Sequence, residues 1–470
     1  MKESAYNVCA RDPDGNYYLF NTRRGAAHVM TACAYESYWV AANRASGLEE
    51  ATETLRDLID KGFLVDNDAD ELSEIVSAHQ KARQSRERLE LLIAPSMACN
   101  LDCFYCFESN RYAGRMSAAV ESNVVRLVRR YFESGTKRLD IMWYGGEPLL
   151  AFSVVKRLSE RFIALCGEFG REYSAEIVTN GTLMSDEKAR LLASWKVKRA
   201  QITLDGVPEL HDARRVPKNR NPTFCRILDG IEAAAVHMHV SVRINVCRKV
   251  AARLEELLQI LAARGLNRVV SVYMAPLQKV QDRKTLPSHE SQPFLSSVAP
   301  QPGGEHLDAL DGREVADLEL RFVDLLWKYG FAVSNRLPEP RCTTCMADKE
   351  HSWLIEANGD VQKCYWTAGL RAEAAGHLTE DGIVPHDPYR KWRDWTAFRN
   401  AGCVQCIMLP ICLGRCPLRH LNHKSDPCPS FKHNWVRVLA RAAGVPDGQL
   451  VPVQLPLAGE KVRELPRAGQ

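Results

Sequence analysis

The segment Leu89–Glu108 reads LELLIAPSMACNLDCFYCFE and joins an apolar strand to a cysteine-rich loop. Residues 89–95 have the composition of a buried strand, and Cys99, Cys103 and Cys106 follow it with the spacing C-x3-C-x2-C. Three cysteines this close usually bind a metal, whereas structural metal sites generally use four ligands. We therefore expect a metal centre that keeps one coordination position open, directly after a strand.

Strand-like and helical patterns alternate downstream of this segment, which indicates an α/β fold. The apolar strand runs lie at 89–95, 138–148, 175–182, 199–206, 240–246 and 268–276. The helical patterns lie at 117–133, 151–168, 185–195, 224–237 and 249–264. This alternation predicts a parallel sheet with right-handed crossovers, either an open sheet or a partial (β/α)6 TIM-like barrel. Ligands of such folds bind at the carboxyl ends of the strands, and the cysteine loop falls there.

The length of 470 residues predicts two or three domains. We expect a winged-helix-like α+β domain over 1–75, a linker helix over 76–90 and the barrel over 91–335. The barrel would include an irregular insertion at 278–315, which is rich in Pro, Ser, Gly and Gln. A cysteine-rich domain over 336–440 and a flexible tail over 441–470 would complete the chain.

Composition narrows the functional classes. The net charge of +4, from 62 basic and 58 acidic residues, argues against an extensive nucleic-acid interface. The sequence has no apolar run of membrane-spanning length and no signal-peptide core at its start, so we expect a cytoplasmic protein without a membrane or nucleic-acid partner. Because the cytoplasm keeps thiols reduced, we do not expect the 16 cysteines to form a disulfide framework. Five isolated ones are interpreted as small buried hydrophobes: Cys9, Cys33, Cys166, Cys225 and Cys247.

The cysteine triplet, with Tyr105 before its last member, resembles the loop of the radical SAM enzymes. The resemblance implies that the three thiolates hold a [4Fe–4S] cluster whose open iron is chelated by S-adenosylmethionine. An electron from a reductase, flavodoxin or ferredoxin would then cleave the sulfonium to a 5′-deoxyadenosyl radical, which abstracts hydrogen from a substrate.

Further motifs follow in the order that the family uses. YGGEP, with Gly145, Gly146 and Glu147, is similar to its GGE motif, in which glycines allow close approach to the ligand and the carboxylate can accept a hydrogen bond from the methionine ammonium. VTNGT, with Asn180, is similar to a segment that faces the cofactor. ITLDG, with Asp205, resembles a segment of peptide-modifying members. The remaining candidate pocket residues, for which a core or surface role stays open, are His211, Arg214, Arg243 and Asn245.

A second group of cysteines resembles the SPASM extension of these enzymes. Its pattern is C-x2-C, then G-x4-C beginning at Gly359, then C-x2-C-x5-C-x3-C, then a final cysteine. The resemblance implies two auxiliary [4Fe–4S] clusters, and hence three clusters in the chain. The first set is Cys342, Cys345, Cys364 and Cys416, and the second set is Cys403, Cys406, Cys412 and Cys428. Zinc knuckles are the alternative for this region taken alone.

The first 75 residues resemble the recognition element that binds leader peptides of ribosomally made precursors. An extended leader would add a strand to an exposed sheet edge. These resemblances favour a maturase that forms an intrapeptide thioether, C–C or C–O cross-link. Epimerisation and sulfatase maturation stay open, although Tyr365 follows Cys364 where sulfatase-maturing enzymes place an acidic base. A non-enzymatic iron–sulfur or zinc scaffold that binds nucleic acid is the alternative from another class.

Overall fold

A computed structural model describes residues 1–43, 53–108, 112, 114–277, 308–333, 337–421 and 428–453. The chain divides into two compact units. The large unit comprises Gln84–Val333 and Lys349–Asp394, and the small unit comprises Met1–Arg83, Ser334–Asp348 and Trp395–Gln470. Among the helices in these described ranges, none combines the length and apolar character that crossing a bilayer requires.

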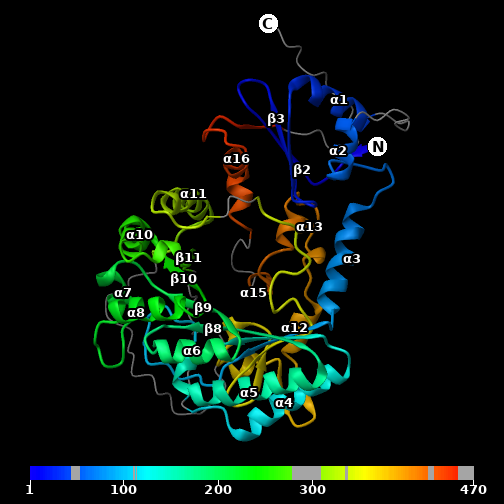
Figure 1. Ribbon diagram of the computed structural model, residues 1–470. Coiled ribbons are helices and arrows are strands. Elements are labelled where there is room, and N and C mark those ends of the chain that lie inside the picture. Colours follow the sequence, from blue (N-terminus) through cyan, green and yellow to red (C-terminus); the bar gives the residue numbers. More distant parts are fainter. Residues whose placement is uncertain are drawn as a thin grey trace. The chain divides into compact units, whose positions relative to one another are not determined.

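The large unit is built on a sheet whose parallel strands follow one another in chain order (Figure 1). These strands are β6 (Arg88–Ile93), β7 (Arg138–Trp143), β8 (Glu172–Thr179), β9 (Val197–Thr203), β10 (His239–Val246) and β11 (Val270–Pro276). Each is paired in parallel with its neighbour. The predicted parallel α/β sheet is confirmed, and it is open, because β11 ends the sheet instead of closing onto β6.

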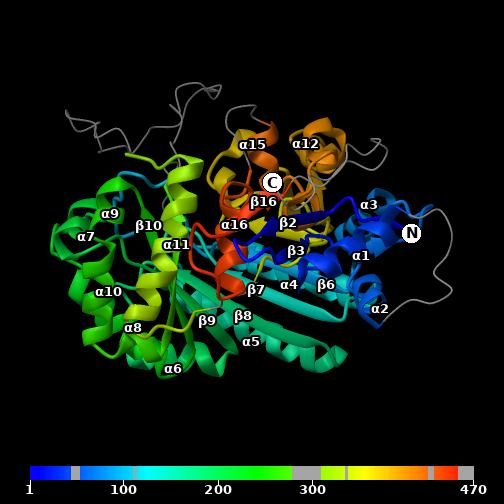
Figure 2. The same cartoon turned by 90° about the horizontal axis from the view of Figure 1, so that it is seen from above.

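Helices connect these strands and lie along one face of the sheet (Figures 1 and 2). They are α4 (Ala118–Glu133), α5 (Phe152–Phe169), α6 (Asp186–Ser194), α7 (Pro208–Arg214), α8 (Phe224–Ala235), α9 (Arg248–Ala252) and α10 (Leu254–Ala263). The helix predicted at 249–264 is divided at Arg253, and α7 was not predicted. α11 (Gly312–Lys328) begins with a capping box between Asp311 and Glu314. Residues 278–307 of the predicted insertion lie outside the described residues.

The large sheet continues beyond β6 into the region predicted to be a separate cysteine-rich domain. β12 (Ser352–Ile355) pairs in parallel with β6, and β13 (Asp360–Gln362), β14 (Gly376–Thr379) and β15 (Gly382–Pro385) extend the sheet in antiparallel fashion. The segment predicted as one domain over 336–440 is thus divided between the two compact units. β12 is buried along its whole length. Pairing with β6 gives its backbone groups hydrogen-bond partners, and its place within the sheet buries its apolar side chains.

The small unit contains an antiparallel sheet in the order β16-β2-β3-β4. Its strands are β2 (Asn7–Arg11), β3 (Tyr17–Asn21), β4 (Ala26–Met30) and β16 (Val451–Val453), and a separate pair is formed by β1 (Lys2–Glu3) and β5 (Leu64–Val65). Within the tail predicted over 441–470, β16 pairs with β2. Residues 454–470 lie outside the described residues.

Both faces of the small sheet are covered. Leu19 packs in a cluster with residues of α1 (Ala32–Asn43) and α2 (Glu53–Asp60), whereas Phe20 packs with Met408 and Leu439 from the cysteine-rich segment. α3 (Glu71–Gln84) begins earlier and ends earlier than the linker helix predicted at 76–90. The remaining helices of the small unit are η6 (Ala397–Arg399), α13 (Ala401–Val404), α14 (Leu409–Cys412), α15 (Pro417–Leu421) and α16 (Phe431–Ala442). The short helices η1 (Pro148–Ala151), η2 (Leu266–Arg268), η4 (Tyr365–Thr367), η5 (Arg371–Glu373) and α12 (Tyr389–Asp394) belong to the large unit.

Candidate active site

The loop after β7 is pressed onto the start of the cysteine loop. A Cβ on Gly146 would lie 2.4 Å from the carbonyl oxygens of Met97 and Ala98, and a Cβ on Gly145 would lie 2.6 Å from that of Ser96. Gly145 also has a φ of +107°, which side chains disfavour. The glycines were expected to make room for a ligand, but their closest contacts are with the cysteine loop, whose backbone they allow to approach.

Glu147 joins the loops after β7 and β8. Its carboxylate is fully buried and accepts hydrogen bonds from Thr179 Oγ1 (2.7 Å), Asn180 N (2.7 Å) and Leu149 N (3.0 Å). Its own backbone N–H donates to the carbonyl of Ala98 at 2.9 Å. Burial raises the pKa of Glu147 above its usual value. The residue therefore fixes three loops in place, and its predicted bond to a methionine ammonium stays a prediction.

Asn180 reaches from the loop after β8 to the first cysteine. Its Nδ2 donates to Asn100 Oδ1 at 2.8 Å and to Cys99 Sγ at 3.7 Å. Its Oδ1 accepts from the backbone and the hydroxyl of Thr182 at 3.0 and 2.7 Å, and Thr182 in turn accepts from Asn100 at 2.8 Å. The structure thus brings Asn180 to the cysteine loop, where an N–H directed at the sulfur stabilises a thiolate ligand.

Tyr105 lies in a buried polar cluster with Asp205, Arg215 and Asn245. Its hydroxyl donates to Asp205 Oδ2 and accepts from Arg215 Nη1 (2.7 Å) and Asn245 Nδ2 (3.3 Å). Arg215 lies 3.7 Å from Asp205, and both side chains are buried. This pairing compensates two charges that would be costly to bury alone. Sequence reasoning missed Arg215, although the segment HDARR offers two adjacent arginines as a signal.

The other candidates support this cluster. Arg214 lies over the rings of Phe104 and Tyr105 at 5.5 and 5.4 Å and donates to Cys247 Sγ at 3.1 Å. Arg243 Nε donates to Asn245 Oδ1 at 2.9 Å, which orients that amide.

His211 is fully buried and accepts the backbone N–H of Asp205 at its Nδ1, 3.2 Å away. Its Nε2 faces the Thr223 hydroxyl at 3.3 Å. Burial lowers the pKa of His211 to about 4, so the ring is neutral at physiological pH. The neutral ring holds the backbone that carries the Asp205 carboxylate.

The three thiols of the loop suit a cationic cluster. Burial, with smaller contributions from the neighbouring Cys106 and Cys99 and against the opposing effect of Arg215, raises the pKa of Cys103 to about 12. Such a thiol ionises only when a metal compensates its charge. Within the described residues no group of three His, Cys, Asp or Glu side chains is arranged to hold a metal ion, so the ligand sets stay predictions. The chemistry of the donors nevertheless fits an iron–sulfur cluster.

Aromatic side chains connect the first cysteine loop to the G-x4-C segment of the large unit. Phe107 stacks on Trp366 with ring centroids 4.4 Å apart, and Tyr365 lies 6.0 Å from Phe107 and 6.3 Å from Tyr144. Tyr365 is 38% exposed. The residue after Cys364 therefore stands beside the candidate site. The sequence showed that Tyr365 follows Cys364 but did not indicate its aromatic neighbours.

The second group of cysteines is divided between the units. Cys364 belongs to the large unit, and the others belong to the small unit: Cys342, Cys345, Cys403, Cys406, Cys412, Cys416 and Cys428. Burial, together with the electrostatic effects of Cys428, Cys403 and Cys406, raises the pKa of Cys412 to about 11. These three neighbours are the other members of the predicted second set.

The large unit carries a three-cysteine loop at the carboxyl ends of its parallel strands, where α/β enzymes bind their ligands. Within this unit, residues 93–261 match the Radical SAM superfamily, so the chain contains a radical SAM domain. Enzymes of this family use a [4Fe–4S] cluster and S-adenosylmethionine, and the thiols of the cysteine loop suit the cluster.

The chain is also similar to proteins of known name. A serine-type anaerobic sulfatase-maturating enzyme of Bacteroides thetaiotaomicron is 22% identical over 387 residues, which cover 73% of this chain and 86% of the relative. The radical SAM cyclopropyl synthase TigE of Paramaledivibacter caminithermalis is 23% identical over 167 residues, 32% of this chain and 34% of the relative. The solved structure of anSMEcpe with bound AdoMet has a TM-score of 0.56 at 18% identity and covers 77% of this chain and 96% of that chain, which shows a shared fold.

Proposed function

We propose that this protein is a radical SAM peptide maturase that forms a thioether, C–C or C–O cross-link within a ribosomally made precursor peptide. The observation that carries the proposal is the meeting of the loops after β6, β7 and β8 around Cys99. When bound, the cluster and S-adenosylmethionine supply a 5′-deoxyadenosyl radical that abstracts hydrogen from the substrate. The sulfatase-maturating relatives act on proteins by name, which supports a peptide substrate.

The chain's own residues divide the work of binding. Cys99, Cys103 and Cys106 hold the cluster, and the Asn180 amide orients the first of these ligands. The residues that we assign to S-adenosylmethionine are Tyr105, Gly145, Gly146, Glu147, Asn180, Asp205 and Arg243. The Tyr105 hydroxyl, the Asp205 carboxylate and the Arg215 guanidinium form a polar cluster in which each group fixes the position of the others. Such preorganisation lowers the entropic cost of positioning the reactants.

Two auxiliary [4Fe–4S] clusters complete the proposal. The effect of Cys428, Cys403 and Cys406 on the pKa of Cys412 supports the second set, and the effect of Cys416 on the pKa of Cys345 supports a shared first set. After the first hydrogen is abstracted, forming a cross-link requires loss of one electron and one proton from the substrate, and an auxiliary cluster would accept the electron. A reductase, flavodoxin or ferredoxin would supply the initiating electron.

The leader of the peptide would dock on strand β4, in a winged-helix-like recognition element. β4 is an edge of the small sheet, since β16 occupies the opposite edge. Beside it lies a pocket of about 280 Å³, lined by Tyr18, Ala27, His28, Val29, Leu337, Leu439, Ala442 and Ala443. Val29 is 51% exposed. An extended peptide can add a strand to such an edge and place an apolar side chain in the pocket.

Mass spectrometry tests this function. The purified holoenzyme, S-adenosylmethionine and dithionite are incubated anaerobically with the short peptide encoded beside its gene. We expect a loss of two hydrogens and a peptide that no longer fragments between the joined residues. An unchanged mass with deuterium uptake from heavy water would instead indicate epimerisation, and an unmodified peptide would contradict the maturase.

Formylglycine formation is a second candidate, because sulfatase-maturating enzymes are among the relatives. Oxidation of a serine also removes two hydrogens, but its product is an aldehyde that a hydrazide probe captures, whereas a cross-link does not react. Tyr365, beside Phe107 and Tyr144, stands where sulfatase-maturing enzymes have an acidic base, which favours the cross-link. Capture of the product by the hydrazide would reverse this preference.

A further inference from the structure

Two buried side chains from the first 83 residues end on main-chain carbonyls of the cysteine loops in the small unit. Thr22, fully buried, donates from Oγ1 to the carbonyl of Ile407 at 2.5 Å. His79, 3% exposed, donates from Nδ1 to the carbonyl of Cys342 at 2.9 Å. Ile407 directly follows Cys406. Each of the two cysteine segments is thus held by one side chain from the N-terminal part of the unit.

Thr22 is fixed by the small sheet. It directly follows β3, and its backbone N–H donates to the carbonyl of Tyr6 at 2.9 Å. Nearby, Phe20 packs in one apolar cluster with Met408 and Ile411. The hydroxyl of Thr22 therefore belongs to a rigid surface on which the Cys406–Cys412 loop rests. The loop's main-chain path, which sets where its thiols point, depends on this contact.

His79 is part of a clamp on the Cys342–Cys345 turn. Its Nε2 lies 3.5 Å from Oδ1 of Asp348, whose side chain is fully buried. Oδ2 of Asp348 accepts the backbone N–H of Thr344 at 3.0 Å. The turn is therefore held at Cys342 by His79 and at Thr344 by Asp348. The ring of Phe398 packs edge-on against His79 at 5.2 Å and fixes its orientation.

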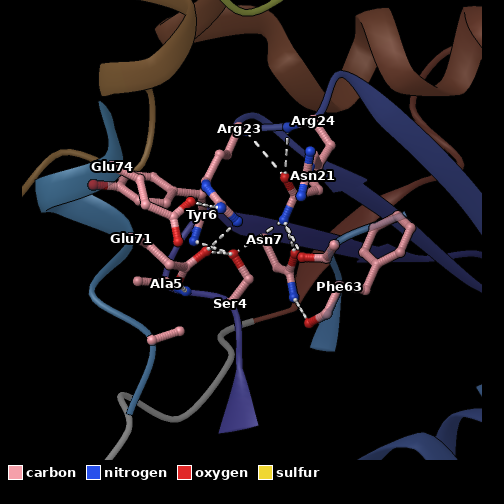
Figure 3. A network of polar contacts seen from close by, with 12 residues as sticks. Ser4, Ala5, Tyr6, Asn7, Asn21, Arg23, Arg24, Phe63, Glu71 and Glu74 are labelled. Atoms are coloured by element: carbon pink, nitrogen blue, oxygen red, sulfur yellow. Dashed lines mark hydrogen bonds and ion pairs between the residues drawn. The ribbon is translucent and has the colours of Figure 1, made fainter. Parts of the chain in front are cut away.

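The helix that carries His79 is bonded to the small sheet at its other end. Glu71, in the first turn of α3, accepts hydrogen bonds from Ser4 Oγ (2.6 Å), Ala5 N (2.9 Å) and Arg23 Nη1 (3.3 Å), as Figure 3 shows. His79 lies two turns further along the same helix. The N-terminal sheet, α3 and both cysteine segments are thereby parts of one packed unit.

We propose that Thr22 and His79 are positioning residues for the two auxiliary clusters, His79 for the one bound by Cys342 and Cys345 and Thr22 for the one bound by Cys406 and Cys412. This inference rests on the proposed function, because it requires that the cysteines bind iron. Residues that orient the ligands of a metal without touching it typically contribute a factor of roughly 10 to 100 in affinity. The recognition element is in this view also the scaffold of the auxiliary clusters.

The test measures iron release from each auxiliary cluster. The full chain with Cys99, Cys103 and Cys106 changed to alanine is reconstituted anaerobically, so that only auxiliary clusters are present, and is challenged with a ferrous chelator. We expect Thr22→Val to accelerate release from one cluster, and His79→Leu from the other, by about tenfold. The two clusters are told apart by their electron paramagnetic resonance signals, which Cys364→Ala and Cys428→Ala assign.

Conservative variants and controls separate positioning from folding. Thr22→Ser keeps the hydroxyl and His79→Asn keeps an N–H near the Nδ1 position, so both should restore slow release. Ser37→Ala, which removes an exposed hydroxyl on α1, and His237→Gln, on the large unit, should leave both rates unchanged. Equal acceleration of both clusters together with a lower unfolding temperature, or rates equal to the parent, would overturn the inference.

The outcome also distinguishes this inference from the proposed function. If the protein binds two auxiliary clusters and their iron-release rates do not change on substitution of Thr22 or His79, only the positioning roles are contradicted. A parent that binds no iron–sulfur cluster contradicts the proposed function, and the positioning roles with it.

Discussion

At the scale of single residues, the candidate site depends on a glycine that leaves no room for a side chain and on a buried carboxylate that accepts several hydrogen bonds. Gly146 has carbonyl oxygens at 2.4 Å from the place of a Cβ, and the Glu147 carboxylate is shared by two loops. These constraints act on the path of the main chain. The cysteine loop is therefore placed by its neighbours as much as by its own sequence.

We predict that Gly146→Ala displaces the cysteine loop, because the added methyl would collide with the carbonyls of Met97 and Ala98. The unfolding free energy should fall by about 1–3 kcal/mol, a typical cost of overpacking, and the first cluster should load poorly. Gly167→Ala is the matched control. It lies in α5 with no atom within 4 Å of its Cβ position and should stabilise the protein by about 0.5–1 kcal/mol. Normal iron loading in Gly146→Ala would contradict the packing argument.

His211 predicts a pH dependence of stability. Burial lowers its pKa from 6.5 to about 4, so the unfolded chain takes up this proton before the folded protein does. The unfolding free energy is therefore unaffected by this group above pH 6.5. It falls as the pH drops from 6.5 towards 4, by about 3 kcal/mol in all. His211→Asn keeps an acceptor for the Asp205 N–H but cannot titrate. Denaturation at several pH values should show a smaller loss for the variant in this window, and parallel curves would disprove the assignment.

At the scale of elements, α3 connects the small sheet to the cysteine segments through Glu71 at one end and His79 further along. We predict that Glu71→Gln lowers the unfolding free energy of the small unit by about 1–3 kcal/mol. The hydroxyl of Ser4 and the N–H of Ala5 each donate to a carboxylate oxygen of Glu71, and the amide NH₂ of glutamine would replace one of these acceptors with a donor. Glu74→Gln removes the neighbouring, 56% exposed carboxylate and should cost little. Equal effects of the two changes in chemical denaturation would contradict this role of α3.

The strands that the sequence predicts differ from those that it does not in how local their sequence signals are. Apolar runs that alternate with helical patterns predicted β6–β11 and their parallel order, because alternate residues of these strands are buried. The pairing of β12 with β6 and of β16 with β2 joins segments more than 250 residues apart, which no local pattern encodes. β4 is half exposed and has a weak apolar pattern, so it was missed.

The sequence predicted the motifs of the candidate site but not the contacts between them. The cysteines and the GGE, TNG and LDG segments are contiguous motifs, and their positions after strands follow from the fold. The roles of Gly146 as a packing contact and of Arg215 as the partner of Tyr105 depend on which loops touch. Such contacts arise from tertiary geometry, which spacing along the chain does not specify.

At the scale of the whole molecule, the chain is organised as two units in which the N-terminal sheet and most of the second group of cysteines belong together. Removing residues 1–75 would expose the apolar side chains of Met408, Ile411 and Leu439 that now pack on that sheet. We predict that this truncation loses the auxiliary clusters, so that iron content falls by about eight atoms per chain. A truncated protein that retains its full iron content would show that the cysteine segments fold without the sheet.

The most direct test of the central claim is the cleavage of S-adenosylmethionine by the reconstituted protein. With dithionite under anaerobic conditions, we predict that the intact chain releases 5′-deoxyadenosine. Cys103→Ala should release none while its auxiliary clusters still load. If the intact protein leaves S-adenosylmethionine uncleaved, or if Cys103→Ala still produces 5′-deoxyadenosine, the cysteine loop after β6 is not the site of radical formation.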